Sequence, residues 1–287
     1  MQTIVLLGAG GQLGKKIAQD FKAFYNVISL DRNKCDIANS VALENIFKYH
    51  HPSIVINCAA YTNVDSAEDD FKKCLSINFS AVKVLAELSN KFKYKLIHFS
   101  TDYVFNAKNN RPIREDDLKE PINAYGLSKL KGENAIENIA KDFYIFRTSW
   151  VYSNDGSNFP KKILSLAKNN EILNIVNDQF GSPTSVDLIS YLVLLSLKNN
   201  IKNGIYHISS SGLCTWFDIA LEILEFTQKK TFYSLKNILP VSSLEFKSKA
   251  MRPTYSYLDN TKIKESLGVE IKNWRVYFNK FLIEEKE

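Results

Sequence analysis

Tyr125 and Lys129 stand four residues apart in the segment PINAYGLSKLKGE, residues 121–133. Its proline-led start and its Lys, Leu, Glu and Ser predict a helix, in which residues four apart share one face. A tyrosine works as an acid or base at neutral pH only if its phenolate is stabilised by roughly 4 kcal/mol, because its pKa is near 10. A nearby ammonium supplies part of that and has three donors, enough to hold a cofactor ribose too. An amphipathic surface helix explains the pair alone equally well, so its neighbours must decide.

A glycine-rich turn near the amino terminus has the spacing of a dinucleotide-binding fingerprint. The apolar run 1–7 predicts a buried parallel strand, GAGGQLG follows at 8–14, and residues 15–24 predict a helix. Gly8, Gly11 and Gly14 are three residues apart. In this strand, turn and helix context they predict a tight turn whose backbone N–H groups face a pyrophosphate.

Asp31 and Arg32 follow the second predicted strand, 26–30. An acid there accepts hydrogen bonds from the adenosine ribose and favours NAD, whereas an adjacent arginine can hold the 2′-phosphate of NADP. The choice between NADH and NADPH therefore stays open. Asp36 and Ile37 either border the adenine or cap the helix predicted from about residue 40 to 50.

Two further predicted strands, 53–60 and 95–100, bring small and hydroxyl-bearing residues to the carboxyl edge of the sheet. This is the edge at which open parallel sheets bind ligands. Residues 59–62 begin with two alanines, which would let a cofactor approach closely. Ser100, Thr101 and Asp102 would face the tyrosine and lysine, although a hydroxyl at a strand end is often only a cap.

Predicted strands and helices alternate along the first half of the chain. Helices at about 67–92 and around Tyr125 precede strands at 95–100 and 143–151. The order predicts an α/β fold, a Rossmann-type doubly wound parallel sheet with a smaller, interleaved substrate-binding domain. We assign residues 1–150 to the dinucleotide-binding domain, with 176–200 packing back on it. Residues 151–175 and 201–287 are assigned to the substrate-binding domain, with helices near 158–169, 216–226 and 273–281 and a strand at 204–209.

The composition is that of a soluble globular protein, with 287 residues, 45% hydrophobic and 24% charged. The net charge of +6 suits an anionic small molecule, but an ordinary solvated surface explains it equally well. Dispersed basic residues argue against nucleic-acid binding. The four cysteines show no spacing typical of a disulfide framework or a zinc site. The apolar runs are too short for a signal peptide or a membrane span, which predicts a cytoplasmic protein.

With these motifs in place, the chain resembles the extended short-chain dehydrogenase/reductases and, among them, the dTDP-4-dehydrorhamnose reductase family. The segments that carry the resemblance lie in the family's order and spacing: GAGGQLG, NCAAYTNVDSAE, HFSTDYVF, EPINAYGLSKLKGE, FRTSWVY, DQFGSPT, GIYHIS, MRPTYSYLD and a final NW. The resemblance implies an oxidoreductase of dTDP-rhamnose and polysaccharide biosynthesis. It would use NADPH or NADH to reduce the C4 ketone of a dTDP-4-ketosugar, dTDP-4-dehydro-6-deoxy-L-mannose. A homodimer is one expectation, but the sequence does not fix the oligomeric state.

The resemblance also implies roles for individual residues. Tyr125 would donate the proton, Lys129 would support it and anchor the ribose, and Thr101 would hydrogen-bond the sugar. Contacts with the cofactor are expected from Gly8, Gly11, Gln12, Leu13, Gly14, Asp31, Arg32, Asp36, Ile37, Ala59, Ala60, Tyr61, Thr62, Tyr125 and Lys129. Substrate contacts are expected from Thr101, Asp102, Trp150 and Arg252.

Three points limit these assignments. Without the resemblance to the family, a position in the hydrophobic core would explain Trp150 equally well. The family commonly has a basic residue where Tyr257 stands, which weakens the diphosphate grip expected of Arg252. Some relatives bind magnesium through acidic residues at a dimer interface, and we find no such cluster here and predict no metal site.

Two other functions remain open. Dehydratases of this fold place an acidic pair after the threonine, whereas here Thr101 is followed by Asp102 and Tyr103. That argues against dehydration but leaves epimerisation open. A non-catalytic regulatory subunit, like the beta subunit of methionine adenosyltransferase, is the alternative from another class. Retention of Trp150 with Thr101, Tyr125 and Lys129 favours catalysis. The exact hexose, the nucleotide base and the cofactor preference stay open.

Overall fold

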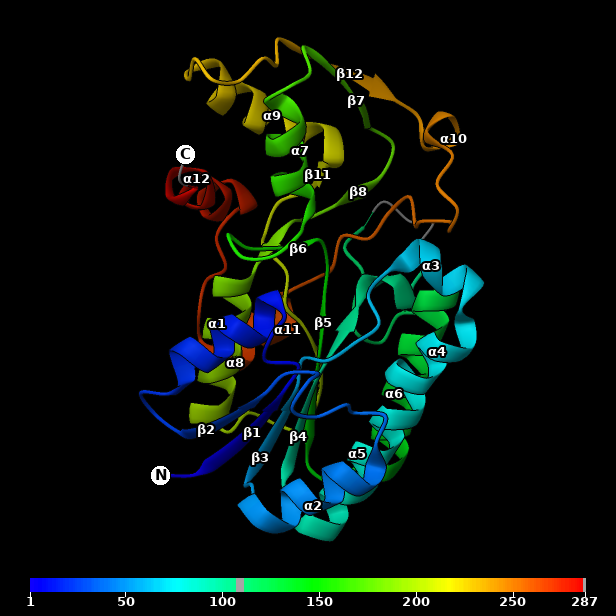
Figure 1. Cartoon of the computed structure of the whole chain (residues 1–287), viewed down its shortest axis with the longest axis vertical. Helices are drawn as coiled ribbons and strands as arrows, with labels where there is room; N and C mark the ends of the chain where they lie inside the picture. Colours follow the sequence, from blue (N-terminus) through cyan, green and yellow to red (C-terminus); the bar gives the residue numbers. More distant parts are fainter. Residues whose placement is uncertain (107–110, 286–287) are drawn as a thin grey trace.

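A computed structural model describes residues 1–106 and 111–285. Six parallel strands form the central sheet in the order β10-β5-β4-β3-β1-β2 (Figure 1). They are β1 (Thr3–Leu7), β2 (Asn26–Leu30), β3 (Ile54–Asn57), β4 (Lys95–Thr101), β5 (Phe143–Thr148) and β10 (Gly204–His207). The strand order reverses between β1 and β3, and a ligand crevice forms at such a switch point. The predicted doubly wound parallel sheet is confirmed.

Helices cover both faces of the sheet, because its strands are apolar on both sides. On one face lie α1 (Gln12–Phe21), α8 (Val186–Lys198) and α11 (Thr261–Leu267). On the other lie α2 (Ser40–His50), α5 (Ala81–Phe92) and α6 (Ala124–Ile139). Figure 1 shows the two layers on either side of the strands.

A second part lies above the carboxyl edge of the sheet in Figure 1. It contains α7 (Phe159–Ala167), α9 (Trp216–Gln228) and α12 (Trp274–Glu284), with β7 (Ile172–Val176) paired in parallel to β12 (Asn237–Val241). The short pairs β6 (Val151–Tyr152) with β9 (Thr184–Ser185) and β8 (Phe180–Gly181) with β11 (Cys214–Thr215) join it to the sheet half, and α10 (Ser243–Phe246) follows β12. This part has its own core around the fully buried Trp274 and Phe278.

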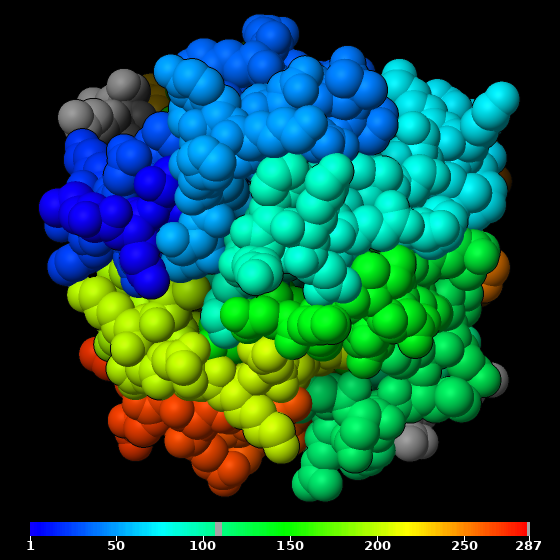
Figure 2. Space-filling view, turned by 90° about the horizontal axis from the view of Figure 1, so that it is seen from below, coloured from blue at the N-terminus to red at the C-terminus, as the bar shows by residue number. Residues whose placement is uncertain are grey.

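The boundary between the two parts differs from the one drawn from the sequence. The strand β10 lies in the segment assigned to substrate binding, yet it pairs with β5 and extends the central sheet. Helix α11, from the same segment, packs on that sheet. In Figure 2 the yellow-green segment lies beside the blue amino-terminal part, and the orange segment lies next to the yellow-green one. A short apolar run reads the same in either half, and only tertiary pairing decides where it goes.

Two predicted elements are broken in the structure. The helix expected at 67–92 consists of α3 (Val64–Asp69), α4 (Phe71–Leu75), the π-helical turn η1 (Ser76–Ser80) and α5. Asp70 starts a new helix there, since its side chain accepts a hydrogen bond from the Lys73 N–H. The strand expected at 143–151 ends at Thr148, because Trp150 has a left-handed backbone with φ of 48°. Within the described ranges, no helix has the length and apolar composition needed to cross a membrane.

Candidate functional site

The glycine turn between β1 and α1 fits a dinucleotide pyrophosphate. Gly8 has φ of 73°, and a Cβ there would lie 2.5 Å from the Ala59 nitrogen. A Cβ on Gly14 would lie 2.3 Å from the Gly8 oxygen, so neither position accepts a side chain. Gly11 is the N-cap of α1, and no described side chain caps that end. The first N–H groups of α1 are therefore free to bind an anion.

Gln12 links this turn to the second part of the molecule. Its side-chain oxygen accepts hydrogen bonds from the Ser153 hydroxyl at 2.9 Å and from Asn158 Nδ2 at 2.8 Å. Its Nε2 donates to the Ser157 carbonyl. The side chain is thus engaged, and the expected cofactor contact of Gln12 is left to its backbone. Leu13 packs partly buried against the sheet core.

The residues expected to border the adenosine lie after β2. Asp31 Oδ1 accepts hydrogen bonds from the N–H groups of Asn33 and Lys34, both at 3.0 Å, which leaves Oδ2 for a ribose. Arg32 is exposed and Ile37 is buried. Asp36 caps a local turn at Ala38, whereas α2 itself is capped by Asn39. The geometry keeps both cofactor options, NADH through Asp31 and NADPH through Arg32.

Residues 59–62 lie beside the glycine turn and are held there by Asn78, which the sequence analysis missed. Asn78 Oδ1 accepts a hydrogen bond from the Tyr61 N–H at 2.8 Å, and Nδ2 donates to the Tyr61 carbonyl at 3.0 Å. Nδ2 also lies 3.0 Å from Ser128 Oγ on α6. Thr62 is exposed, and Ala59 and Ala60 are half-buried. In the sequence, Asn78 is only an amide residue within the helix predicted at 67–92.

Helix α6 brings Tyr125 to the end of β4. Asn123 caps the helix by accepting a hydrogen bond from the Gly126 N–H at 2.7 Å. A Cβ on Gly126 would lie 2.1 Å from the Tyr103 oxygen, so glycine allows α6 to approach the 3-10 turn η2 (Asp102–Val104) closely. The rings of Tyr103 and Tyr125 meet edge to face with centroids 5.8 Å apart. Tyr125 is thereby fixed in its first-turn position beside Thr101.

The protonation of Tyr125 differs from the expectation. Burial raises the pKa of Tyr125, and the charge of Asp102 raises it further, while a side-chain hydrogen bond with Thr101 acts in the opposite direction. The sequence argument instead expected Lys129 to lower this pKa. Desolvation of the half-buried Tyr125 side chain, which packs against Tyr103 of η2, is the largest of these effects on its pKa. Tyr125 therefore holds its proton firmly, as a proton donor must before the reaction.

Lys129 points into the protein and is only 2% exposed. Its Nζ donates to the Phe99 carbonyl at 2.6 Å and lies 3.1 Å from His98 Nε2, both on β4. Burial lowers the pKa of Lys129 to about 8, against the charges of Glu133 and Cys74, which raise it. Two of the positions around Nζ are thus occupied by contacts with β4, which leaves the others for the expected ribose contact.

Thr101 and Asp102 form a buried acidic corner at the end of β4. The Thr101 hydroxyl donates to Asp102 Oδ1 at 2.9 Å and accepts a hydrogen bond from the Tyr103 N–H. Asp102 Oδ2 and Ser100 Oγ are buried without a hydrogen-bond partner in the described chain. Burial raises the pKa of Asp102 to about 7, and its hydrogen bond with Thr101 opposes that rise. Unpaired buried oxygens of this kind suit a ligand rich in hydroxyl groups.

The two remaining residues that are expected to bind substrate, Trp150 and Arg252, have different surroundings. Trp150 is half-buried and stacks on Trp216, with ring centroids 3.7 Å apart and planes inclined by 15°. A Cβ on Gly181 would lie 2.7 Å from the Trp150 ring, so that glycine makes room for the stack. The sequence analysis missed Trp216, because its contact with Trp150 joins segments more than sixty residues apart.

Arg252 is paired with an acid in this structure. Its guanidinium contacts both oxygens of Asp65 on α3, at 3.2 and 2.8 Å. A diphosphate at this point would have to compete with that carboxylate. The Tyr257 hydroxyl, in the position where a basic residue was expected, accepts a hydrogen bond from the Gly212 N–H at 3.0 Å.

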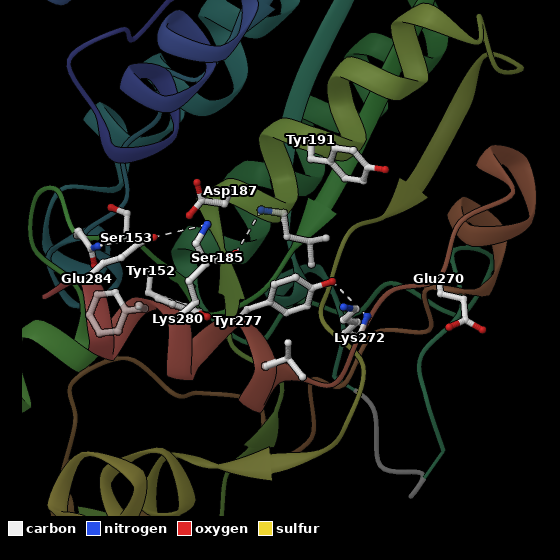
Figure 3. Close-up of a pocket in the computed structure, with 14 residues that line it drawn as sticks. Tyr152, Ser153, Ser185, Asp187, Tyr191, Glu270, Lys272, Tyr277, Lys280 and Glu284 are labelled. Atoms are coloured by element: carbon white, nitrogen blue, oxygen red, sulfur yellow. Dashed lines mark hydrogen bonds and ion pairs between the residues drawn. The ribbon is translucent and has the colours of Figure 1, made fainter. Parts of the chain in front are cut away.

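A separate pocket of about 430 Å³ lies between α8 and α12, on the side of the sheet opposite α6. Figure 3 shows Tyr191, Tyr277, Lys272 and Glu270 along its walls, with the Tyr277 hydroxyl bonded to the Lys272 N–H. None of its lining residues belongs to the predicted site. In residues 1–106 and 111–285, no three or more His, Cys, Asp or Glu side chains gather in a group that could hold a metal ion.

Comparisons with known proteins cover nearly the whole chain. The family model described as "RmlD substrate binding domain" matches residues 1–286. The spore coat polysaccharide biosynthesis protein SpsK of Bacillus subtilis is 38% identical over 285 residues, 99% of this chain and 98% of that protein. A dTDP-4-dehydrorhamnose reductase of Aggregatibacter actinomycetemcomitans is 35% identical, covering 96% of each chain. The structure is similar to that of a Bacillus anthracis dTDP-4-dehydrorhamnose reductase in complex with NADP, with a TM-score of 0.94, 33% identity and coverage of 99% and 100%.

Proposed function

The chain belongs to the dTDP-4-dehydrorhamnose reductase family, and on that premise we propose that it reduces the C4 ketone of dTDP-4-dehydro-6-deoxy-L-mannose to give dTDP-L-rhamnose. The observation that carries the proposal is the placement of Tyr125 beside Thr101 at the carboxyl edge of the sheet. The same edge carries the free N–H groups of α1. The residue proposed as proton donor and the turn proposed to bind the dinucleotide thus lie at the same edge of the sheet.

The chain's residues would divide the work as follows. A bound reduced nicotinamide supplies the hydride. Burial raises the pKa of Tyr125 and so keeps its hydroxyl protonated. Tyr125 would give this proton to the oxygen that develops negative charge at C4. Thr101 would hydrogen-bond that oxygen, and Lys129 would support the phenolate left on Tyr125. A positioned acid of this kind contributes typically about 100- to 10,000-fold to the rate.

Substrate binding would fall to the acidic corner and the aromatic stack. Asp102 Oδ2 is buried and unpaired among the described residues, so a sugar hydroxyl could satisfy it. Trp150, made rigid by Trp216, would offer a flat apolar face to the deoxysugar. Arg252 would bind the diphosphate once its pairing with Asp65 is exchanged. These assignments, the homodimer and the cytoplasmic location remain predictions.

For the cofactor we propose NADPH, with NADH as the alternative. The solved relative from Bacillus anthracis contains NADP. In this chain Arg32 is exposed beside the ribose position, while Asp31 Oδ1 is occupied by two backbone N–H groups. A 2′-phosphate would therefore meet a free guanidinium next to a partly engaged carboxylate.

The test is turnover of Tyr125→Phe with dTDP-4-dehydro-6-deoxy-L-mannose and NADPH. We expect a loss of about 100-fold or more in kcat with cofactor affinity retained, because the phenol hydroxyl is the only group removed. Tyr49→Phe, at an exposed tyrosine on α2, is the matched control and should be fully active. Unchanged turnover in Tyr125→Phe would remove the mechanism.

The substrate is tested by offering purified protein a panel of dTDP-, GDP- and UDP-ketosugars and following the absorbance of the reduced nicotinamide. A reductase consumes one reduced cofactor for each ketosugar, whereas an epimerase recycles it. A protein that binds NADPH but does not oxidise it with any ketosugar of the panel would instead fit the regulatory-subunit alternative.

A further inference from the structure

Three buried polar side chains form a line from the sheet to α6. Asn57 at the end of β3, His98 on β4 and Lys129 on α6 are each no more than 2% exposed. Asn57 Nδ2 lies 3.1 Å from His98 Nδ1, and His98 Nε2 lies 3.1 Å from Lys129 Nζ. The imidazole therefore bridges an amide and the amine that the reaction is proposed to use.

The orientation of the amide is fixed from outside the line. The Ala59 N–H donates to Asn57 Oδ1 at 3.1 Å, so the NH2 group of Asn57 must be the part that faces His98. That NH2 group only donates, and His98 Nδ1 must accept from it. A neutral imidazole carries its single proton on the other nitrogen, Nε2. His98 is neutral because burial holds its pKa well below the usual range, and a charged Lys129 would lower it further.

The Nε2–H of His98 then points at Lys129 Nζ. An ammonium has three N–H donors and no lone pair, so it would set donor against donor across this 3.1 Å contact. A neutral amine has a lone pair and accepts the hydrogen bond. It still keeps N–H groups for the Phe99 carbonyl, 2.6 Å away.

We propose that His98 is a positioning residue that, in the cofactor-free protein and above neutral pH, holds Lys129 as a neutral amine through a hydrogen bond from His98 Nε2–H to Lys129 Nζ. Asn57 is the residue that fixes this tautomer. The ammonium form of Lys129 then requires a proton from solvent and the loss or rearrangement of the contact with His98. The hydrogen bond from His98 thereby sets the pH above which Lys129 is no longer an ammonium that can support Tyr125.

The other ionisable groups near Lys129 either favour its ammonium form or act on the protonation of other residues. Glu133, one turn further along α6, and Cys74 on α4 both favour the ammonium. Glu133 is itself held by two hydrogen bonds from Arg147. From η2, Asp102 and Tyr103 act on Tyr125. On α3, Asp65 is paired with Arg252. His98 is thus the contact that favours the neutral amine.

The direct test reads the tautomer in the wild-type, cofactor-free protein. Long-range ¹H–¹⁵N correlation spectra of ¹⁵N-labelled protein distinguish a protonated Nε2 from a protonated Nδ1, and they are recorded above the Lys129 pKa of about 8. We expect His98 to be protonated on Nε2. His207 is the internal control, since its Nδ1 faces the Ile113 carbonyl at 3.1 Å and its Nε2 faces Arg147, which requires the opposite tautomer. A His98 protonated on Nδ1, or on both nitrogens, overturns the proposal.

Asn57→Asp reverses the prediction without changing the shape of the side chain. A carboxylate at position 57 accepts from both the Ala59 N–H and His98 Nδ1, so the proton of His98 moves to Nδ1 and Nε2 becomes an acceptor for an ammonium. We expect the spectrum to show this exchange. If the proposed reductase activity holds, the alkaline limb of its kcat/KM profile should also move to higher pH, by about one pH unit or more.

A second pair of variants separates positioning from folding. His98→Phe removes the donor and should raise the alkaline limb as Asn57→Asp does. His98→Gln can present an amide N–H to Lys129 and should restore the wild-type limb. A merely structural role would change kcat and leave the limb in place in all three variants, which would overturn the proposal. If His98→Phe fails to fold, the tautomers of the wild type and of Asn57→Asp still decide. The spectra do not depend on turnover, so they separate a failure of this proposal from a failure of the proposed function.

Discussion

Helix α6 carries two buried ionisable groups one turn apart, and their surroundings differ. Glu133 makes an ion pair with Arg147 on β5, and both side chains are fully buried. Lys129 is equally buried but contacts a carbonyl and an imidazole, neither of which carries a charge. The same helix thus presents an ion pair at one position and, four residues earlier, an ionisable amine without a counter-charge in contact.

In the first cluster each of the three guanidinium nitrogens of Arg147 has a hydrogen-bond partner. Arg147 reaches both oxygens of Glu133 at 2.9 and 2.8 Å, and its NH1 donates to the Glu115 carbonyl. The guanidinium also lies over the ring of Phe105, 4.9 Å from its centroid. Such a cluster locks β5, α6 and the segment before α6 together. It has no labile proton to offer.

The second cluster has the opposite property. Burial lowers the pKa of Lys129 to about 8 and raises that of Asp102 to about 7, because neither charge has a partner of opposite sign in contact. Both groups therefore change protonation near neutral pH. In this protein, burial with a partner of opposite charge produces a fixed charge, whereas burial without one produces a group that changes protonation near neutral pH. The second kind lies where the reaction is proposed.

The largest effect is expected when one partner of the Arg147–Glu133 pair is removed. Arg147→Met should lower the free energy of unfolding by about 3–5 kcal/mol, because it leaves the Glu133 carboxylate buried without a counter-charge. Urea unfolding of purified protein at pH 7 measures the change. The matched control is Arg147→Met combined with Glu133→Gln, which should recover part of the loss. A single variant as stable as the wild type would mean that the pair does not hold the two elements together.

The next effect concerns the mobile proton of Asp102. Its pKa in the folded protein, about 7, exceeds the unfolded value near 3.9, so the folded state binds the extra proton between these values. Stability must then fall as the pH rises from 4 to 7. Asp102→Asn removes this fall, and the stability of the wild type relative to the variant should drop by roughly 3 kcal/mol over that interval.

Urea unfolding at pH 4 and pH 7 tests the Asp102 prediction. Asp116→Asn, at an exposed aspartate in the segment before α6, serves as the control and should leave the pH dependence as it is in the wild type. A wild type and an Asp102→Asn variant with the same slope would show that Asp102 titrates as an ordinary surface acid. The second cluster would then lose its distinction from the first.

The sequence predicted the parts of the site that lie close together along the chain. The glycine turn follows its strand directly, Tyr125 and Lys129 share one helix, and Thr101 ends a strand whose edge is known from the fold class. What Lys129 contacts was not predictable. His98 is a polar residue in an apolar strand, and nothing in its sequence neighbourhood indicates its partner. Its contact with Lys129 depends on how α6 packs on β4.

The same limit explains Asn78 and Trp216. Both act on a segment distant in the sequence, Tyr61 and Trp150 respectively, and each looks like an ordinary helix residue in its own surroundings. The strand β10 shows the limit at the level of the fold, since its apolar run carries no mark of its partner. Local patterns therefore predicted the elements and the acid–base pair, whereas tertiary contacts determined the partners.

The smallest expected effect supplies the baseline for both clusters. Arg275 and Glu222 form an ion pair on the surface between α12 and α9, at 2.6 Å, with Arg275 half exposed. Solvent screens such a pair, so Glu222→Gln should change the free energy of unfolding by less than about 0.5 kcal/mol, and added salt should reduce even that. Arg275 keeps its place over Trp274 in this variant, so only the charge is tested. Urea unfolding at low and high salt measures it. A loss comparable to that of Arg147→Met would mean that burial is not what separates strong from weak pairs in this protein.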